Sequence, residues 1–139
     1  MTTHSDLTDR LDIAEVLNRY AFAIDDKDWV ALGEIFTDDC IADYGPFGTF
    51  DGSAAVVDWM APAHVGLTTQ HAMANMVITV SGDTATARSY VTVSLQPDGH
   101  EPFRVGGAYH DEFRRTGDRW QISNRSYTTI WQHGAPPGG

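Results

Sequence analysis

The hydrophobic residues of this chain change their spacing once, near residue 68, and this change restricts the possible folds more than any single motif. Before that point they recur about every 3.6 residues, which is the period of an amphipathic helix. After it, hydrophobic and polar residues alternate, and Val, Thr and Tyr become frequent, as is typical of β-strands. Helices followed by strands that short turns connect predict an α+β domain.

The first half of the chain predicts three helices with one brief strand between the second and the third. In chain order, the expected ranges are 7–24 (helix), 29–36 (helix), 40–44 (strand) and 53–60 (helix). Asp28 can cap the second helix, since its side chain can accept a bond from a free backbone N–H. Pro62 is expected to close the third helix, because proline lacks the N–H that a helix needs.

The second half predicts four strands in a row, joined by turns that each contain a glycine. Their expected ranges are 68–80, 84–95, 103–115 and 119–131. Antiparallel strands of this length twist and curl strongly. We therefore expect a cone-shaped curved antiparallel sheet, with the three helices covering its concave side. Such a cone has one open mouth, which suits a small-molecule pocket.

Length and composition indicate one globular domain and restrict its partners. The 139 residues, 42% of them hydrophobic, fit one domain over 1–139, with flexible tails expected at 1–5 and 134–139. The formal net charge of −10 argues against nucleic acid and anionic membrane surfaces as partners. We find no membrane span, signal peptide or metal-ligand spacing, so we expect a cytoplasmic protein with no metal and no cofactor. Cys40, the single cysteine, is expected to be a passive buried thiol.

Three residues form a candidate acid–base group. Tyr20 and Asp25 lie at the end of the first predicted helix, and His71 lies near the start of the first long strand. Strand alternation places His71 and Asn75 on one largely apolar face, which we expect to line the cone. A carboxylate that accepts a bond from one imidazole nitrogen leaves the other free to act as a base. Alternatively, all three residues are structural.

Further residues are candidates for substrate binding. Tyr44 follows Asp43 on the short strand, and it lines the pocket or packs at an edge. Either Tyr109 or His110 reaches the pocket, because the two glycines before them make strand parity unreliable. Strict alternation places Arg125 on the face of its strand opposite to that of Trp120. A buried arginine could bind an anionic group or neutralise a carboxylate. With Asn75, these are the expected binding residues.

Five motifs together resemble the SnoaL-like family of the nuclear transport factor two-like superfamily, over nearly the whole chain. They are Ile13-x3-Leu17-x2-Tyr20-x4-Asp25, Asp28-Trp29-x2-Leu32-x3-Phe36-x-Asp38-Asp39, Gln70-His71-x3-Asn75, Gly107-x-Tyr109-x3-Phe113-x-Arg115 and Trp120-x-Ile122-x2-Arg125. The family includes scytalone dehydratase, bile acid 7α-dehydratase and hexachlorocyclohexane dehydrochlorinase. In this branch an Asp after the first helix pairs with a His on the first long strand. The resemblance implies that Asp25, His71 and Tyr20 are catalytic, and less directly that Arg125 takes part.

Two hypotheses from different classes follow. The first is a cofactor-independent lyase or isomerase, dehydratase-like, that acts on a small apolar cyclic molecule such as a polyketide, terpenoid or steroid. The second is a non-catalytic domain of the same fold that binds a small ligand or a partner. We also expect a homo-oligomer, a trimer or dimer. The basis is an apolar convex face, in which Val91, Val93 and Leu95 alternate with polar residues.

Overall fold

The computed structural model describes residues 4–135 and contains the three predicted helices. The longest, α1 (His4–Asp25), is followed by α2 (Trp29–Ile35) and, after two short strands, by α3 (Ser53–Ala63). The Asp28 side chain caps α2 by accepting a 3.1 Å hydrogen bond from the backbone N–H of Ala31. Of the predicted tails, residues 1–3 and 136–139 lie outside the described residues, whereas residues 4 and 5 belong to α1.

Three details between residues 35 and 63 differ from the prediction. Strand β1 (Phe36–Asp43) begins directly where α2 ends, and a one-turn helix, η1 (Gly45–Phe47), leads to β2 (Thr49–Asp51). Sequence patterning missed β2 because three residues are too few to show an alternation. Pro62 does not close α3 but lies in its last turn. Proline removes one N–H donor from this turn, and the helix continues for only one further residue, to Ala63.

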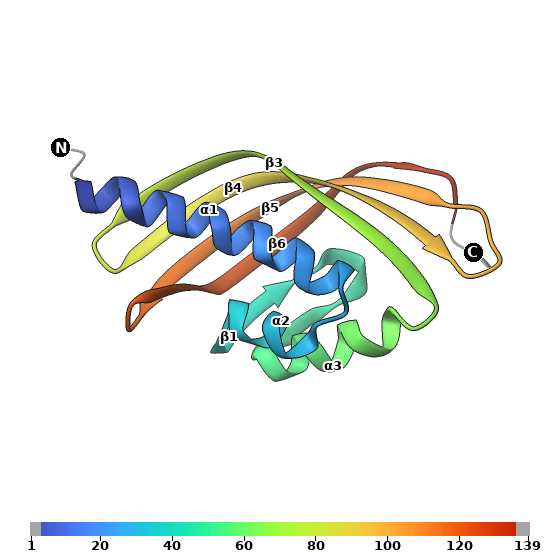
Figure 1. Ribbon diagram of the computed structural model, residues 1–139, viewed down its shortest axis with the longest axis horizontal. Coiled ribbons are helices and arrows are strands. Elements are labelled where there is room, and N and C mark those ends of the chain that lie inside the picture. Colours follow the sequence, from blue (N-terminus) through green and yellow to red (C-terminus); the bar gives the residue numbers. More distant parts are fainter. Residues whose placement is uncertain (1–3, 136–139) are drawn as a thin grey trace.

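Four long antiparallel strands form most of the sheet, as predicted: β3 (Leu67–Ser81), β4 (Thr84–Pro97), β5 (Phe103–Thr116) and β6 (Arg119–His133). The order across the sheet is β2-β1-β6-β5-β4-β3, and within residues 4–135 only the neighbours β1 and β6 run parallel. The sheet is strongly curved and does not close into a barrel. Helix α1 lies along its concave side, with α2 and α3 beyond the end of α1 (Figure 1).

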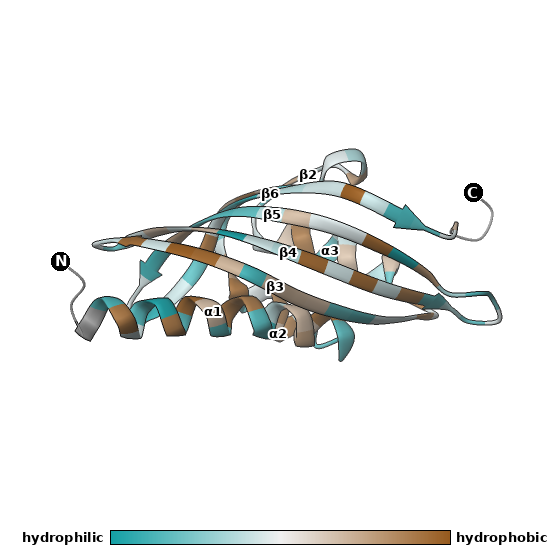
Figure 2. Ribbon diagram, turned by 90° about the horizontal axis from the view of Figure 1, so that it is seen from above, coloured by the Kyte–Doolittle hydropathy of each residue, from teal (hydrophilic) through white to brown (hydrophobic). Residues whose placement is uncertain are grey.

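The core lies between α1 and the inner face of the sheet. Ile13, Leu17, Tyr20 and Ile24, spaced three and four residues apart, form one fully buried stripe of α1. Hydrophobic and hydrophilic residues alternate along β3 and β4 (Figure 2), so that each strand buries one set of side chains. This packing fixes which residues of each strand can reach a site on the concave side.

A β-bulge in β3 changes the strand parity that simple alternation predicts. In β3, Asn75 and Met76 together oppose the single residue Ser89, and Asn75 has a positive φ of 55°. Beyond this bulge the inward residues are Met76, Ile78 and Val80. Val77, which uninterrupted alternation would place on the same face as His71, is 67% exposed. A bulge inserts one unpaired residue, so every following side chain changes face.

The residues proposed for an apolar convex face belong to the other side of the sheet. Val91 is fully buried in the core, and Val93 packs against it. In β4 the outward residues are those of opposite parity, such as Arg88 and Tyr90. The specific face proposed for a symmetric partner was therefore wrong, because the alternation was assigned to the wrong side.

Candidate active site

The end of α1 places Asp25 beside the first long strand. The backbone N–H of Asp28 donates to Ala23 O at 2.8 Å and that of Lys27 to Ile24 O at 3.0 Å, which is the Schellman pattern of a helix end. Lys27 has the positive φ (56°) that this pattern requires. The chain thus turns away after Asp25, and α1 presents the carboxylate to β3.

Asp25 and His71 are in direct contact. The Nδ1 atom of His71 lies 2.7 Å from Asp25 Oδ1, and the backbone N–H of His71 donates to Asp25 Oδ2 at 2.9 Å. The Thr69 hydroxyl donates to Oδ1 at 2.8 Å. The side chains of His71 and Asp25 are only 8% and 16% exposed. The pair that the sequence motif predicted is therefore formed, at a protected position between α1 and β3.

These contacts fix the charge of Asp25 and the tautomer of His71. Burial raises the pKa of the Asp25 carboxyl, but the hydrogen bonds from His71 and Thr69 outweigh it, and the net pKa is lowered. An ionised carboxylate only accepts, so Nδ1 of His71 carries the proton. Among the described residues, none hydrogen-bonds to His71 Nε2. That nitrogen is available as a base.

Three phenols meet deeper in the cone. The Tyr20 hydroxyl lies 2.8 Å from that of Tyr44 and 3.3 Å from that of Tyr109. The Tyr20 ring is fully buried and edge-on to His71, with 6.3 Å between ring centroids. Burial raises the pKa of all three phenols, so they remain protonated. Tyr20, Tyr44 and Tyr109, predicted separately, therefore form one hydrogen-bonded group next to His71.

A buried ion pair supports the phenol group. Arg125 Nε and Nη2 donate to the two carboxylate oxygens of Asp111, at 2.7 and 3.0 Å, and neither side chain is exposed. Arg125 Nη1 donates to the Tyr44 hydroxyl at 3.4 Å. Of the two partners predicted for Arg125, an anionic ligand or a carboxylate of the protein, the structure contains the carboxylate, that of Asp111.

The role of Asp111 was missed at the sequence level, although a signal was available. Strand alternation already places Asp111 on the same face as Tyr109 and Phe113, and an acidic residue on a buried face needs a cationic partner. Simple alternation along β6 places Arg125 on the face opposite to that of the buried Trp120. A bulge at Ser123, between the pairs Glu112–Asn124 and Phe113–Ile122, instead turns Arg125 inward.

Two predicted binding residues do not reach this group. Asn75 is exposed, because its positive φ places it in the β3 bulge and away from the concave face. His110 is also exposed, on the outer face of β5, so that Tyr109 and not His110 points inward. Tyr127, which was not predicted, lies inside, with its ring centroid 5.4 Å from that of Tyr109.

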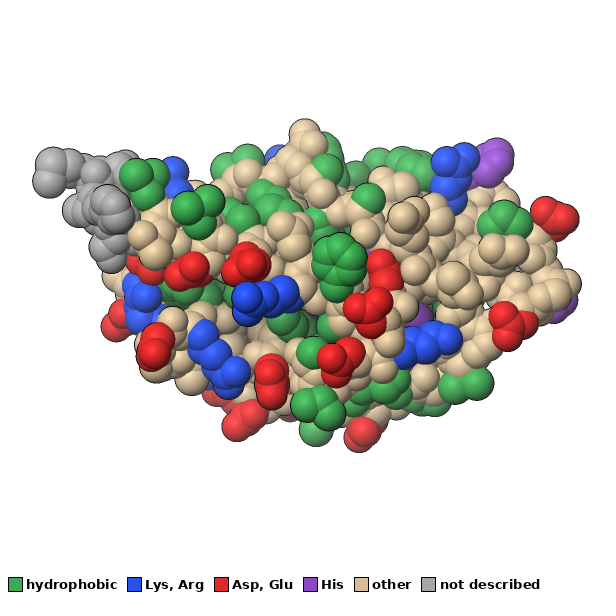
Figure 3. Space-filling view, viewed as in Figure 1, with side chains coloured by type: hydrophobic (Ala, Val, Ile, Leu, Met, Phe, Trp, Pro, Cys, Tyr) green, Lys and Arg blue, Asp and Glu red, His purple; other side chains and the backbone are tan. Residues whose placement is uncertain are grey.

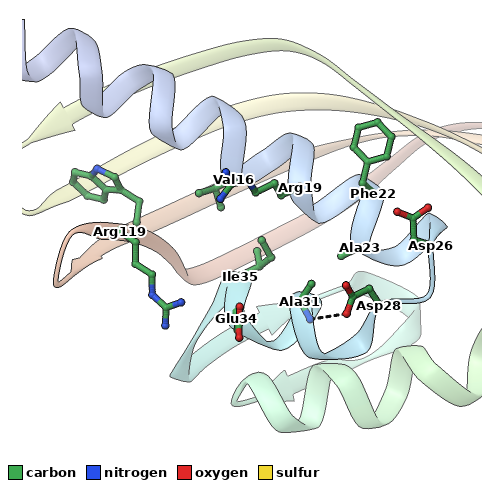
Figure 4. Close-up of a pocket in the computed structure, with 11 residues that line it drawn as sticks. Val16, Arg19, Phe22, Ala23, Asp26, Asp28, Ala31, Glu34, Ile35 and Arg119 are labelled. Carbon is green, nitrogen blue, oxygen red and sulfur yellow. Dashed lines mark hydrogen bonds between the residues drawn. The ribbon is translucent and has the colours of Figure 1, made fainter.

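A hollow of about 290 Å³ lies elsewhere, between α1, α2 and the start of β6. Its floor contains apolar side chains such as Val16 and Ile35, and charged side chains, among them Arg19, stand at its edges (Figures 3 and 4). Asp25, His71 and Tyr20 do not line it. The predicted pocket and this hollow are therefore different places. Within residues 4–135, no group of three His, Cys, Asp or Glu side chains could hold a metal ion.

Comparison with known proteins identifies the family. The model of the SnoaL-like domain matches residues 5–126. The chain belongs to the SnoaL-like family. A similar chain is Rv2910c of Mycobacterium tuberculosis, an uncharacterized protein that is 30% identical over 136 residues. The alignment covers 95% of this chain and 92% of that protein.

Solved structures show the same fold for this SnoaL-like protein. The crystal structure of LinA has a TM-score of 0.87 and 22% identity, with 99% of this chain and 100% of that chain covered. A proposed scytalone dehydratase from Novosphingobium aromaticivorans has a TM-score of 0.88 and 22% identity, with 100% and 99% covered. At these identities the likeness establishes the fold, and residue roles need separate support.

Proposed function

We propose that this SnoaL-like protein is a cofactor-independent lyase or isomerase, dehydratase-like, that acts on a small apolar cyclic molecule. The observation that carries the proposal is the 2.7 Å contact between Asp25 and His71 Nδ1, together with a free Nε2. This is the arrangement in which an oriented imidazole accepts a proton and the carboxylate stabilises the imidazolium. The family match favours the same reaction class, and so do two structural neighbours, a proposed scytalone dehydratase and a LinA that is described as a hexachlorocyclohexane dehydrochlorinase.

In this proposal His71 Nε2 removes a proton from a carbon of the substrate. The C–H electron pair forms a new double bond. In an elimination the bond to the leaving group breaks, and a leaving hydroxide takes the proton back from the imidazolium. In an isomerisation the proton returns to another carbon. Tyr20 supports the developing negative charge through its hydroxyl contacts with Tyr44 and Tyr109.

The test is proton abstraction measured in D₂O. A panel of cyclic ketones and β-hydroxy ketones is followed by NMR for loss of the acidic C–H signal and by mass spectrometry for loss of water. We expect His71→Ala to slow exchange by about 10²–10⁴-fold, the usual contribution of a positioned base. His110→Ala is the matched control, because His110 is exposed on the outer face of β5.

Two further variants define the roles within the site. Asp25→Asn should slow exchange nearly as much as His71→Ala, because an amide cannot stabilise the imidazolium. Tyr20→Phe should cost less and leave the dependence on His71 in place. A His71→Ala protein with near wild-type exchange would rule out the mechanism.

A non-catalytic small-ligand-binding or partner-binding domain is the second candidate. It is favoured by one observation, namely that the 290 Å³ hollow lies apart from Asp25 and His71. If no panel compound exchanges or eliminates while a compound still binds, this second function replaces the first.

A further inference from the structure

The hollow between α1, α2 and the start of β6 presents apolar side chains at the surface of the protein. Its volume of about 290 Å³ is close to the lower end of the range for small-molecule sites, about 300–1,000 Å³. Val16 and Ile35 belong to its floor, and the ring of Phe22, which also lines it, is 66% exposed. A ligand with a small apolar body could therefore bury its own surface here together with that of Phe22.

The floor of the hollow is held in a fixed arrangement. Trp120 lines it and is itself only 2% exposed. The indole Nε1 of Trp120 donates to Asp9 Oδ1 at 3.2 Å, and the Cζ atom of Arg115 lies 4.4 Å from the ring centroid. These contacts tie the indole to α1 and to β5, so a ligand would meet a preformed apolar surface.

The charges at one end of the hollow favour a cation. Asp26 and Asp28 lie there, beside the C-terminus of α1 (Figure 4). Within residues 4–135 neither carboxylate has an ion pair with a basic side chain, and Lys27 does not line the hollow. The C-terminus of a helix carries partial negative charge, and the last turn of α1 contains no basic residue. A cation bound here would interact favourably with both carboxylates and with the helix terminus.

The two arginines that line the hollow do not offer an equivalent place for an anion. Arg19 is already paired with Glu15, with 3.2 Å between Nη2 and Oε2. Arg119 lies at the end of the hollow opposite Asp26 (Figure 4). The formal net charge of −10 repels anions from the whole molecule and attracts cations to it.

We propose that this hollow is a second binding site, for an organic cation with a small apolar body, such as an aromatic ammonium compound. The apolar body packs on Phe22 and Trp120, and the ammonium group lies between the carboxylates of Asp26 and Asp28. The site is separate from the proposed catalytic residues, since Asp25 and His71 do not line the hollow.

The test is an NMR titration of the ¹⁵N-labelled protein with three probes that share a phenyl ring. They are 2-phenylethylammonium, 2-phenylethanol and phenylacetate, at low ionic strength. We expect 2-phenylethylammonium to shift the Trp120 indole N–H signal and the backbone N–H signal of Ala31, which donates to Asp28. Phenylacetate should bind about tenfold more weakly, and phenylethanol should lie between the two.

A double variant tests the two carboxylates. Asp26→Asn combined with Asp28→Asn should weaken binding of 2-phenylethylammonium about fivefold, the effect of two exposed charge pairs. The cap of α2 is retained in this variant, because asparagine caps a helix as well as aspartate does. The matched control combines Asp12→Asn with Asp58→Asn, which removes the same charge from exposed positions outside the hollow and should keep the wild-type affinity.

A substitution at the edge of the hollow tests the apolar contribution. Phe22→Ser should weaken binding of 2-phenylethylammonium and of phenylethanol alike, because both probes lose the same ring contact. Leu11→Ser is the control, since Leu11 is 72% exposed on the same helix and does not line the hollow.

Four results would overturn the proposal. The first is an absence of binding at millimolar concentration, and the second is equal affinity for 2-phenylethylammonium and phenylacetate. The third is an unchanged affinity in the double Asn variant, and the fourth is a set of shifts centred on His71 instead of Trp120. Binding of 2-phenylethylammonium should persist in His71→Ala, so this proposal and the catalytic one can fail independently.

Discussion

Asp25 carries a negative charge at the end of a 22-residue helix, where the helix dipole disfavours it. Three hydrogen bonds offset this cost, two from His71 and one from Thr69. A neutral or basic residue would suit the end of α1 better if stability were the only requirement. The position of Asp25 therefore agrees with a functional role for its carboxylate.

Asp9 illustrates a carboxylate with a structural role. It accepts two bonds from Arg115, at 3.0 and 2.8 Å, and one from Trp120 Nε1 at 3.2 Å, and so ties the start of α1 to the sheet. The bonds from Arg115 hold its pKa below the usual value, against the opposing effect of burial.

The lowered pKa of Asp9 predicts a pH-dependent contribution to stability. The contribution is fully present above the unfolded-state pKa of about 3.9 and is lost as the pH falls through the lower folded-state value. Asp9→Asn should therefore lower the urea midpoint at neutral pH and flatten its fall below about pH 4. Asp12→Asn is the control, since Asp12 is exposed on the same helix. Equal midpoint profiles for Asp9→Asn and wild type would contradict this assignment.

At the scale of elements, the β3 bulge determines which side chains face the core. Asn75 occupies the left-handed region at φ 55°, which asparagine tolerates better than most residues and β-branched residues tolerate poorly. The bulge allows His71 and Met73 to face inward before it and Met76 and Ile78 after it. It also lets a 15-residue strand bend around α1.

Substitutions at Asn75 test this conformation. Asn75→Gly should leave stability nearly unchanged, whereas Asn75→Ile should lower the free energy of unfolding by about 1–2 kcal/mol, the cost of the left-handed conformation. Thr79→Ile is the matched control, an exposed position of the same strand. Urea unfolding monitored by tryptophan fluorescence measures all three. Equal losses for Asn75→Ile and Thr79→Ile would contradict the role of the bulge.

At the scale of the whole molecule, the oligomeric state remains a prediction. Two large aromatic side chains, Tyr90 and Trp131, are 42% and 44% exposed on strands β4 and β6. They replace Val91, Val93 and Leu95 as candidates for a contact between copies. None of the described helices is long and apolar enough to cross a membrane.

Sedimentation tests this prediction directly. We expect a dimer or trimer, and substitution of Tyr90 and Trp131 by serine should shift the protein toward the monomer. Thr86→Ser on the same strand is a control that leaves the aromatic surface intact. A wild-type mass near 15.3 kDa at working concentration would refute the prediction.

The sequence by itself determined the order of helices and strands, the α+β class and the meeting of Asp25 with His71. Periodicity predicts helices and long strands well because each spans many residues. The end of the first helix could also be predicted, because the charged turn that follows it is adjacent in the sequence. The pairing of Asp25 and His71 came from the family motif, which fixes their spacing along a known fold.

Only the tertiary structure decided where Asn75, His110 and Arg125 point and that Asp111 is the partner of Arg125. Each of these depends on strand register, and one bulged residue reverses every later side chain without changing the hydrophobic pattern enough to be noticed. The three phenols likewise come from α1, from the residue that follows β1 and from β5, and no local signal relates these positions. Their hydrogen-bonded group exists only because the curved sheet brings the three elements together around one buried arginine.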